Sequence, residues 1–293
     1  MQFTGAFTAL VTPFRNGEVD EEAYRALIEW QIEQGIDGLV PCGTTGEAAT
    51  LSHAEQGRVI GICVDQVKGR VPVIAGAGSN NTKEAVELTL LAKKAGADAA
   101  LQITPYYNKP TTQGLIGHYQ AISKEASMPI ILYNVPGRTG LNLLPENLAK
   151  IAKAVPDVKG VKEATGDLKQ ATDVLEHCGR NFTLLSGDDF TVLPLLSVGG
   201  RGVISVIANI MPSAMAGLCR AFREGDMKTA QDLHLKMNPV NRAMFFETNP
   251  IPVKTSLALM GVIPAQEFRL PLCQLLPENK TRLEGVLRSV GLI

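Results

Sequence analysis

The feature that most constrains the fold of this 293-residue chain is an alternation repeated along its first three quarters. Short runs rich in Val, Ile and Leu are each followed by a longer segment in which apolar residues recur at helical spacing. Such runs are typical of strands buried on both faces of a parallel sheet. Eight of them occur, at residues 6–11, 38–41, 73–75, 99–103, 130–133, 160–162, 183–185 and 202–206.

The segments between these runs predict helices, for example at 21–34, 54–68, 83–95 and 115–126. Ser52 and Glu55 have the spacing of a capping box before the second of these, and Asn81 with Glu84 is a weaker version before the third. Eight strand-helix units favour an α/β fold of the (β/α)8 TIM-barrel type over an open doubly wound sheet. The glycine fingerprint of dinucleotide-binding proteins is missing as well.

From about residue 225 onward the strand pattern stops, and helices are expected at 226–246, 252–260 and 278–290. We therefore predict a catalytic (β/α)8 barrel at 1–224 and a C-terminal helical domain at 225–293. Residues 202–219 carry no charge and approach the length of a membrane span. Pro212 within them suits the first turn of a helix, which favours a buried strand followed by a helix.

Composition excludes several kinds of partner. The chain has 28 basic and 29 acidic residues and no basic cluster that could follow a nucleic-acid backbone. Five scattered cysteines without a C-x-x-C pair suit a reducing compartment. The four histidines show no metal-ligand spacing, so no metal is expected. We expect a cytoplasmic protein that binds neither nucleic acid nor membranes.

Polar residues follow four of the predicted strands. GTTGE at 43–47 follows the second, TPYY at 104–107 follows the fourth, YNVPGR at 133–138 ends the fifth and KEATG at 162–166 ends the sixth. In a TIM barrel the reacting groups lie at the carboxyl ends of the strands. The sequence therefore predicts one site on this rim.

Lys162 is the candidate nucleophile of this site. Strand alternation places Val158, Gly160 and Lys162 on one face, and if that face is the barrel interior, the amine is enclosed. An enclosed amine is more readily uncharged and attacks carbonyl groups. A lysine at a strand end can equally reach solvent or pair with a carboxylate, and the spacing leaves both interpretations open.

Three other features of this rim each allow a functional and a purely structural interpretation. The GTTG run at 43–46 can turn N–H groups toward a carboxylate, or it can be an ordinary tight turn. Tyr133, predicted on the same face as Ile131, can exchange a proton near the amine or bond its hydroxyl locally. Arg138 can clamp a second carboxylate, or it can be a solvated turn residue.

Taken together, these residues resemble the dihydrodipicolinate synthase (4-hydroxy-tetrahydrodipicolinate synthase) family of pyruvate-dependent class I aldolases, over the whole chain. The Arg-Thr-Gly sequence at 138–140 resembles the synthases and not the related sugar-acid lyases, such as N-acetylneuraminate lyase. The motifs that carry the resemblance are GTTGE at 43–47, PYYN at 105–108, YNVPGRTG at 133–140, GVKEATG at 160–166, LSGDD at 185–189 and NPIPVK at 249–254.

The resemblance implies a lyase of the diaminopimelate route of L-lysine biosynthesis that needs no cofactor. Lys162 would form a Schiff base with pyruvate, and the derived enamine would attack L-aspartate 4-semialdehyde. Tyr133 would be the proton donor and acceptor, linked through Thr44 to Tyr107, which in the family enters from the neighbouring subunit of a tight dimer. Thr45 and the backbone of Ile204 would hold the pyruvate carboxylate.

The resemblance also implies Arg138 as the receptor of the semialdehyde carboxylate and a homotetramer built as a dimer of dimers. Many members bind L-lysine as an allosteric inhibitor. The residues that match this effector pattern are His53, Asn80, Glu84 and Tyr106. Ala48 and Gln56 depart from it, because Ser and His are often found at these places. Two other functions stay open: an aldolase for other 2-oxo acids with the same imine, and a non-catalytic pyruvate-binding barrel.

Overall fold

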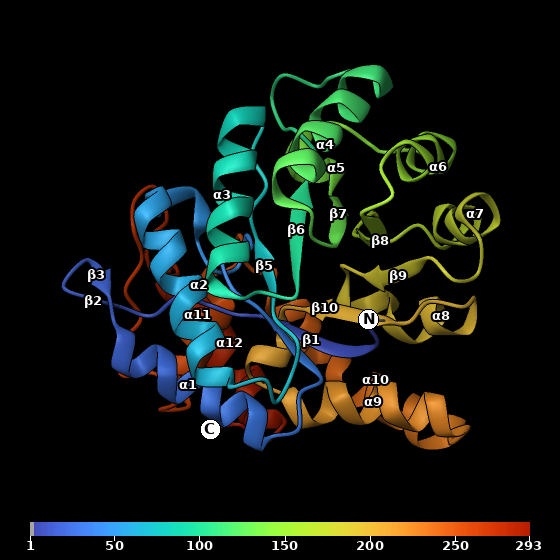
Figure 1. Cartoon of the computed structure of the whole chain (residues 1–293). Coiled ribbons are helices and arrows are strands. Elements are labelled where there is room, and N and C mark those ends of the chain that lie inside the picture. Colours follow the sequence, from blue (N-terminus) through green and yellow to red (C-terminus); the bar gives the residue numbers. More distant parts are fainter. Residues whose placement is uncertain (1–2) are drawn as a thin grey trace.

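The computed structural model describes residues 3–293, which form a parallel barrel surrounded by helices (Figure 1). Its sheet has the order β4-β1-β10-β9-β8-β7-β6-β5. A bridge between Leu39 on β4 and Val73, the residue before β5, brings the two ends of the sheet together. The predicted TIM barrel is thus confirmed. The barrel strands are β1 (Gly5–Ala9), β4 (Gly38–Val40), β5 (Ile74–Gly76), β6 (Ala99–Ile103), β7 (Ile130–Asn134), β8 (Val158–Glu163), β9 (Thr183–Ser186) and β10 (Gly202–Ser205).

Helices follow the strands and cover the outside of the sheet (Figure 1). The capping box before α2 is present, since Ser52 accepts from the Glu55 N–H and Glu55 accepts from the Ser52 N–H. The helices of this layer are α1 (Glu21–Glu33), α2 (His53–Val67), α3 (Thr82–Ala95), α4 (Thr112–Ala126), α5 (Pro136–Thr139), α6 (Pro145–Ala154), α7 (Leu168–Cys178), α8 (Val192–Ser197) and α9 (Pro212–Glu224). Three 3₁₀ turns lie at Ala48–Thr50, Asp189–Thr191 and Ile207–Asn209.

One small element was not expected. The short strands β2 (Phe14–Arg15) and β3 (Glu18–Val19) pair as an antiparallel hairpin outside the barrel. Asn16 and Gly17 between them both have positive φ, of 54° and 79°. An Asn-Gly pair of this kind is the usual connection of a two-residue hairpin, so the signal was present in the sequence.

Large and small side chains alternate inside the barrel. Phe7 on β1 lies opposite Gly38 on β4, and a Cβ at Gly38 would overlap the Phe7 ring. Further apolar side chains, among them Ile131, Leu185 and Ile204, complete this inner cluster. The interior is therefore a packed core that closes the floor of the barrel below its carboxyl-terminal rim.

The expected alternation along β8 holds only in part. Gly160 faces inward, where a Cβ would meet Ile131, but Val158 packs with the outer, helix-facing cluster. The register between β7 and β8 shifts at this point, because Ile130 pairs with Val158 whereas Ile131 pairs with Gly160. One extra residue in a strand reverses the faces of the residues before it, so the prediction for Val158 was wrong.

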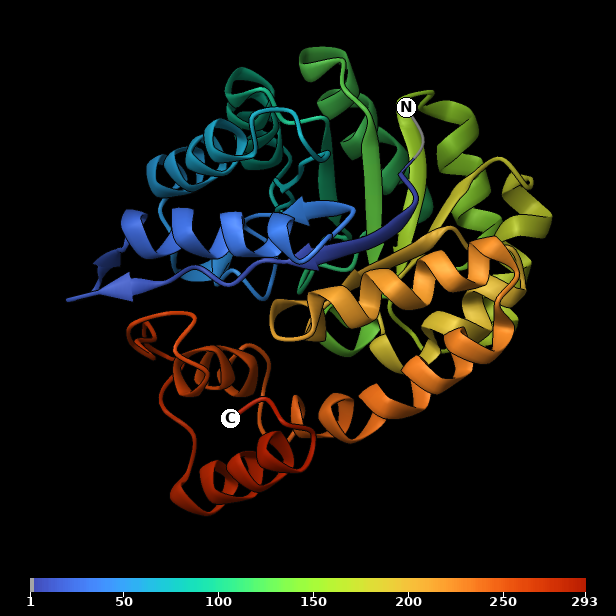
Figure 2. The same ribbon diagram turned by 90° about the horizontal axis from the view of Figure 1, so that it is seen from below.

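The last three helices are α10 (Met227–Ala243), α11 (Ile251–Leu259) and α12 (Pro277–Ser289), close to the expected ranges. Figure 2 shows them, in orange to red, gathered at one side of the barrel. Apolar residues of these helices belong to the same buried cluster as residues of α1, α2 and α9. The division into domains at residue 224 stays a prediction.

Within residues 3–293, no helix is both long enough and apolar enough to cross a membrane. The uncharged run 202–219 divides into β10 and α9, and α9 begins at Pro212.

Candidate active site

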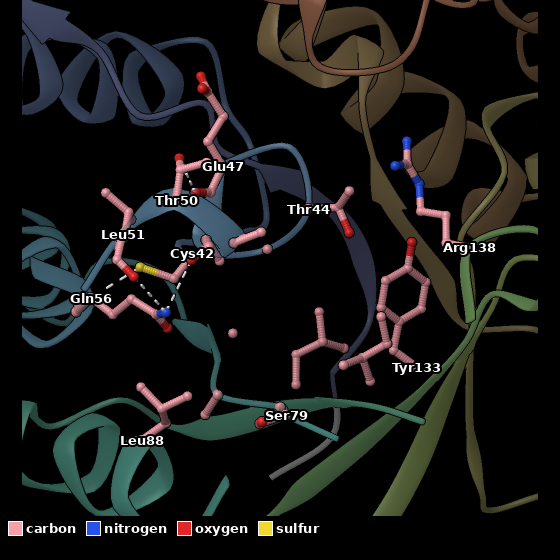
Figure 3. Close-up of a pocket in the computed structure, with 18 of the residues that line it drawn as sticks. Cys42, Thr44, Glu47, Thr50, Leu51, Gln56, Ser79, Leu88, Tyr133 and Arg138 are labelled. Carbon is pink, nitrogen blue, oxygen red and sulfur yellow. Dashed lines mark hydrogen bonds between the residues drawn. The ribbon is translucent and has the colours of Figure 1, made fainter. Parts of the chain in front are cut away.

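A cavity of about 490 Å³ opens where β4, β5, β6 and β7 end (Figure 3). The loops after these strands line it, and residues 248–250 and 271–272 of the C-terminal part complete the wall. In Figure 3 the phenol of Tyr133 points between the side chains of Thr44 and Arg138. Residues of three of the predicted polar runs, at 43–47, 104–107 and 133–138, therefore line one space, and Lys162 adjoins it through its contact with the Tyr133 ring.

Lys162 lies beside Tyr133. The residue is only 6% exposed, and its Nζ lies 4.2 Å from the centre of the Tyr133 ring. The two residues are Cα partners in the β7–β8 ladder. Within residues 3–293 no carboxylate lies within 4.0 Å of Nζ, so both alternatives, a solvated lysine and an ion-paired one, disagree with the geometry. The aliphatic part of the side chain runs past Gly187, where a Cβ would crowd it at 3.1 Å.

The loop after β4 is both a tight turn and an anion-binding candidate. Backbone bonds from Gly46 to Gly43 and from Glu47 to Thr44 close the turn. Among the described residues, the N–H groups of Thr44 and Thr45 donate to no protein acceptor, and they remain for a bound carboxylate.

Two links from the C-terminal part hold this loop, and the sequence reasoning missed both. The side-chain amide of Asn249 donates to Thr45 Oγ1 at 3.0 Å. Lys254 on α11 forms an ion pair with Glu47 at 2.6 Å, and both side chains are fully buried. Burial lowers the pKa of Lys254 to about 8, although the Glu47 carboxylate acts in the opposite direction. Both residues lie in quoted motifs, but their pairing spans 207 residues of sequence.

Arg138 lies on α5, directly after β7. It is exposed, lines the cavity and donates through Nη2 to the backbone oxygen of Asn249 at 3.2 Å. Asn249 thus links Arg138 to the Thr44–Thr45 turn, and the Tyr133 phenol points between Arg138 and Thr44 (Figure 3).

Tyr107 and Ile204 lie in opposite environments. Ile204 is 1% exposed inside the barrel, near Tyr133 and Leu185. Tyr107 is 91% exposed with a φ of 67°, and the structure does not bring it to Tyr133 within this chain.

The predicted effector residues extend the same cavity. His53, Glu84 and Tyr106 line it together with Thr44 and Tyr133. The Asn80 amide donates to the Tyr106 backbone oxygen at 3.2 Å. Glu84 accepts from Ser79 Oγ at 2.8 Å and from the Asn81 amide at 3.2 Å, which also fits its position in the first turn of α3.

A parallel barrel with an enclosed lysine and a tyrosine at its carboxyl-terminal rim defines the class I aldolase type of enzyme. The model of the Dihydrodipicolinate synthetase family matches residues 2–290. The chain belongs to this family.

Individual relatives agree over the full length. A protein of Maridesulfovibrio salexigens named 4-hydroxy-tetrahydrodipicolinate synthase is 70% identical, and the match covers 100% of both chains. The structure of a chloride-inhibited dihydrodipicolinate synthase from Acinetobacter baumannii, complexed with pyruvate, is 43% identical with a TM-score of 0.96, over 99% of each chain. The enzyme from Cyanidioschyzon merolae with lysine bound is 39% identical with a TM-score of 0.95, over 99% of each chain. The expected family, and with it a synthase function of the lyase type, is confirmed.

Proposed function

We propose that this chain condenses pyruvate with L-aspartate 4-semialdehyde through a Schiff base on Lys162, the activity of a 4-hydroxy-tetrahydrodipicolinate synthase in diaminopimelate and L-lysine biosynthesis. The observation that carries the proposal is the Lys162 amine, which is buried, has no carboxylate within 4.0 Å in the described part of the chain and lies 4.2 Å from the Tyr133 ring centre. A primary amine in such a place adds to a small ketone. The pyruvate bound to the Acinetobacter relative supports the choice of ketone.

The proposed reaction passes through an iminium ion and an enamine on Lys162. The Lys162 nitrogen adds to C2 of pyruvate, and the carbinol oxygen leaves as water to give an iminium ion. Loss of a methyl proton gives the enamine, whose carbon attacks the aldehyde carbon of the second substrate. The amino group of that substrate then adds to the iminium carbon, closes the ring and releases Lys162. The iminium serves as the electron sink for the carbon–carbon bond formation.

The cavity walls supply the remaining roles. Tyr133 has its phenol beside the amine and transfers protons to and from the carbinol and the aldehyde oxygen, through Thr44 as the next hydroxyl. The free N–H groups of the Thr44–Thr45 turn hold the pyruvate carboxylate together with the backbone of Ile204. Arg138 holds the carboxylate of the semialdehyde.

Assembly and regulation extend this proposal. We place Tyr107 in the site of a neighbouring copy within a homotetramer, because its side chain is almost fully exposed next to Tyr106 of the cavity wall. L-Lysine is the proposed inhibitor at His53, Asn80, Glu84 and Tyr106, supported by the lysine-bound relative. Ala48 and Gln56 differ from the frequent pattern, and titration of turnover with L-lysine tests the site. The cytoplasm remains the predicted location.

Reductive trapping tests the central step. Incubation with pyruvate and borohydride, followed by peptide mass spectrometry, should place the adduct on Lys162. Lys162→Ala should fold normally and lose both the adduct and nearly all turnover. An unmodified Lys162 in the native chain favours the non-catalytic pyruvate-binding barrel and overturns the proposal.

The substrate choice is tested separately. Turnover with L-aspartate 4-semialdehyde should exceed turnover with a panel of 2-oxo-3-deoxy acids. A normal adduct on Lys162 without turnover of the semialdehyde would assign the chain to the other aldolases.

A further inference from the structure

A closed group of polar side chains lies on the outer side of β7 and β8, behind the reactive residues. Its members are Asn134, Asn142, Glu163 and Gln170. Asn134 is 0% and Glu163 3% exposed. Neither the catalytic scheme above nor the anion-binding loops use this group.

The Glu163 carboxylate is the centre of the group. Its Oε1 accepts from the Thr165 N–H at 2.9 Å, and its Oε2 accepts from the amides of Asn134 and Gln170, both at 3.0 Å. Within residues 3–293 no Lys, Arg or His lies within ion-pair distance of it. A buried carboxylate without a cation is costly, and it is retained only where hydrogen bonds satisfy it.

A backbone donor fixes the direction of these bonds. The Leu143 N–H donates to Asn134 Oδ1 at 2.9 Å, so the Asn134 amino group must point toward Glu163. Three donors therefore meet at position 163, and a carboxylate is the side chain that accepts without donating. A glutamine at position 163 would turn its own N–H groups toward the N–H groups of Asn134 and Gln170.

The position of this bond in the sheet links it to the reaction. Asn134 is the Cα partner of Glu163, and the preceding residues, Tyr133 and Lys162, are Cα partners of each other. Because successive side chains point to opposite faces, the outer pair is bonded while the inner pair holds the phenol and the amine. A change in separation or rotation of the outer pair must move the inner pair as well.

We propose that Glu163 is a positioning residue for the reaction: its hydrogen bond to Asn134 sets the geometry between the Lys162 amine and the Tyr133 phenol. The inference rests on the proposed function. Misplacement of reacting groups by about 1 Å can cost about 100-fold in rate. We expect Glu163→Gln to slow borohydride-trapped imine formation about 10- to 100-fold, with an equal fall in kcat and little change in the KM of the semialdehyde.

The double variant Glu163→Gln with Gln170→Glu exchanges the carboxylate and the amide, and so tests whether restored hydrogen bonds restore the trapping rate. In this double variant the carboxylate introduced at position 170 accepts from the amide introduced at position 163. It also accepts from the Asn142 amide, which already donates to residue 170 at 2.9 Å. The oxygen of the introduced amide still accepts from Thr165 and Asn134. Every donor again has an acceptor, although Asn142 Oδ1, which accepts from the Gln170 amide at 3.0 Å in the native chain, then faces a carboxylate oxygen. The double variant should therefore recover part of the trapping rate that Glu163→Gln loses.

Gln102→Leu is the matched control. Gln102 is a buried outward-facing residue of the adjacent strand β6, and its amide donates to Thr89 Oγ1 at 2.8 Å. Its loss removes a buried hydrogen bond behind a strand that carries neither the amine nor the phenol. Thr89 Oγ1 still donates to the Ala85 oxygen in this variant, and we expect trapping at the native rate.

The outcomes separate the two proposals. Slow trapping in Glu163→Gln with recovery in the double variant supports the positioning role. Native trapping by Glu163→Gln, or equal slowing by Gln102→Leu, overturns it while the proposed function stands. Absence of the adduct in the native chain overturns the proposed function itself. If Glu163→Gln does not fold, Glu163→Asp takes its place, because it keeps a group that only accepts hydrogen bonds but shortens the side chain by one methylene. Its rate of borohydride trapping is measured in the same way.

Discussion

The buried ion pair between Lys254 and Glu47 allows a sharp test of how the C-terminal part holds the cavity wall. Lys254→Met removes the cation but leaves the carboxylate, which is fully buried and 2.6 Å from the lost amine. Removing one partner of a buried pair costs about 3–5 kcal/mol, because the other charge stays in place without compensation. For a chain of this size the loss amounts to on the order of 10 °C in Tm.

The matched comparison is the double variant Glu47→Met with Lys254→Met. Two apolar side chains fill the volume without a buried charge, and such replacements are often neutral. The Lys254 ammonium lies 4.1 Å from the centre of the Phe14 ring, so methionine finds apolar neighbours there. We expect the double variant to recover most of the lost Tm. If the single variant melts within about 2 °C of the native chain, or the double variant melts as low as the single, the reasoning fails.

The same pair predicts a pH dependence with a definite sign. The folded chain binds the Lys254 proton less tightly than the unfolded chain, since the pKa is about 8 when folded and about 10.4 when unfolded. Between these values the unfolded chain carries more protons, so this group makes the free energy of unfolding rise with pH, by at most about 1.4 kcal/mol per unit. The advantage of the native chain over Lys254→Met should therefore grow from about pH 8 to about pH 10 in urea melts. A constant difference would contradict the assignment.

Two further predictions concern a buried histidine and the second substrate. Burial lowers the pKa of His118 to about 4, so the unfolded chain binds more protons below about pH 6.5 and the native chain loses stability toward about pH 4. His118→Gln should show a flatter Tm-against-pH curve over this range, and parallel curves would refute the assignment. Arg138→Ala should raise the KM of the semialdehyde by about 10-fold or more and leave pyruvate trapping on Lys162 near the native rate; equal losses for both substrates in steady-state kinetics would contradict the clamp.

Much of the barrel could be predicted from the sequence because its signals are local. Each strand is a short apolar run, each helix has its own period, and Ser52 with Glu55 marks a helix start within four residues. The rim residues could be found in the same way, since the carboxyl ends of parallel strands meet at one edge.

What could not be predicted depends on register or on pairs far apart in the chain. The shift between Ile130 and Ile131 turned Val158 outward, and no local pattern marks it. The bonds from Asn249 to Thr45 and from Lys254 to Glu47 join residues 204 and 207 positions apart. Such contacts follow from the packing of α11 against the barrel, which a single sequence read for local periodicity does not specify.

The strands of the barrel are not equally well paired all the way round the sheet. The β7–β8 ladder pairs five residues of each strand, whereas no ladder joins β4 to β5 and only the Leu39–Val73 bridge, with backbone bonds from Leu39 to Pro72 and from Gly76 to Pro41, is found there among residues 3–293. The turn at 43–46, the proposed carboxylate site, leaves the sheet at this sparsely paired seam, while the amine and the phenol lie on the β7–β8 ladder. Local opening concentrates where few backbone bonds resist it. Local opening of the sheet is therefore expected beside the turn at 43–46 before it reaches the ladder that carries the amine and the phenol.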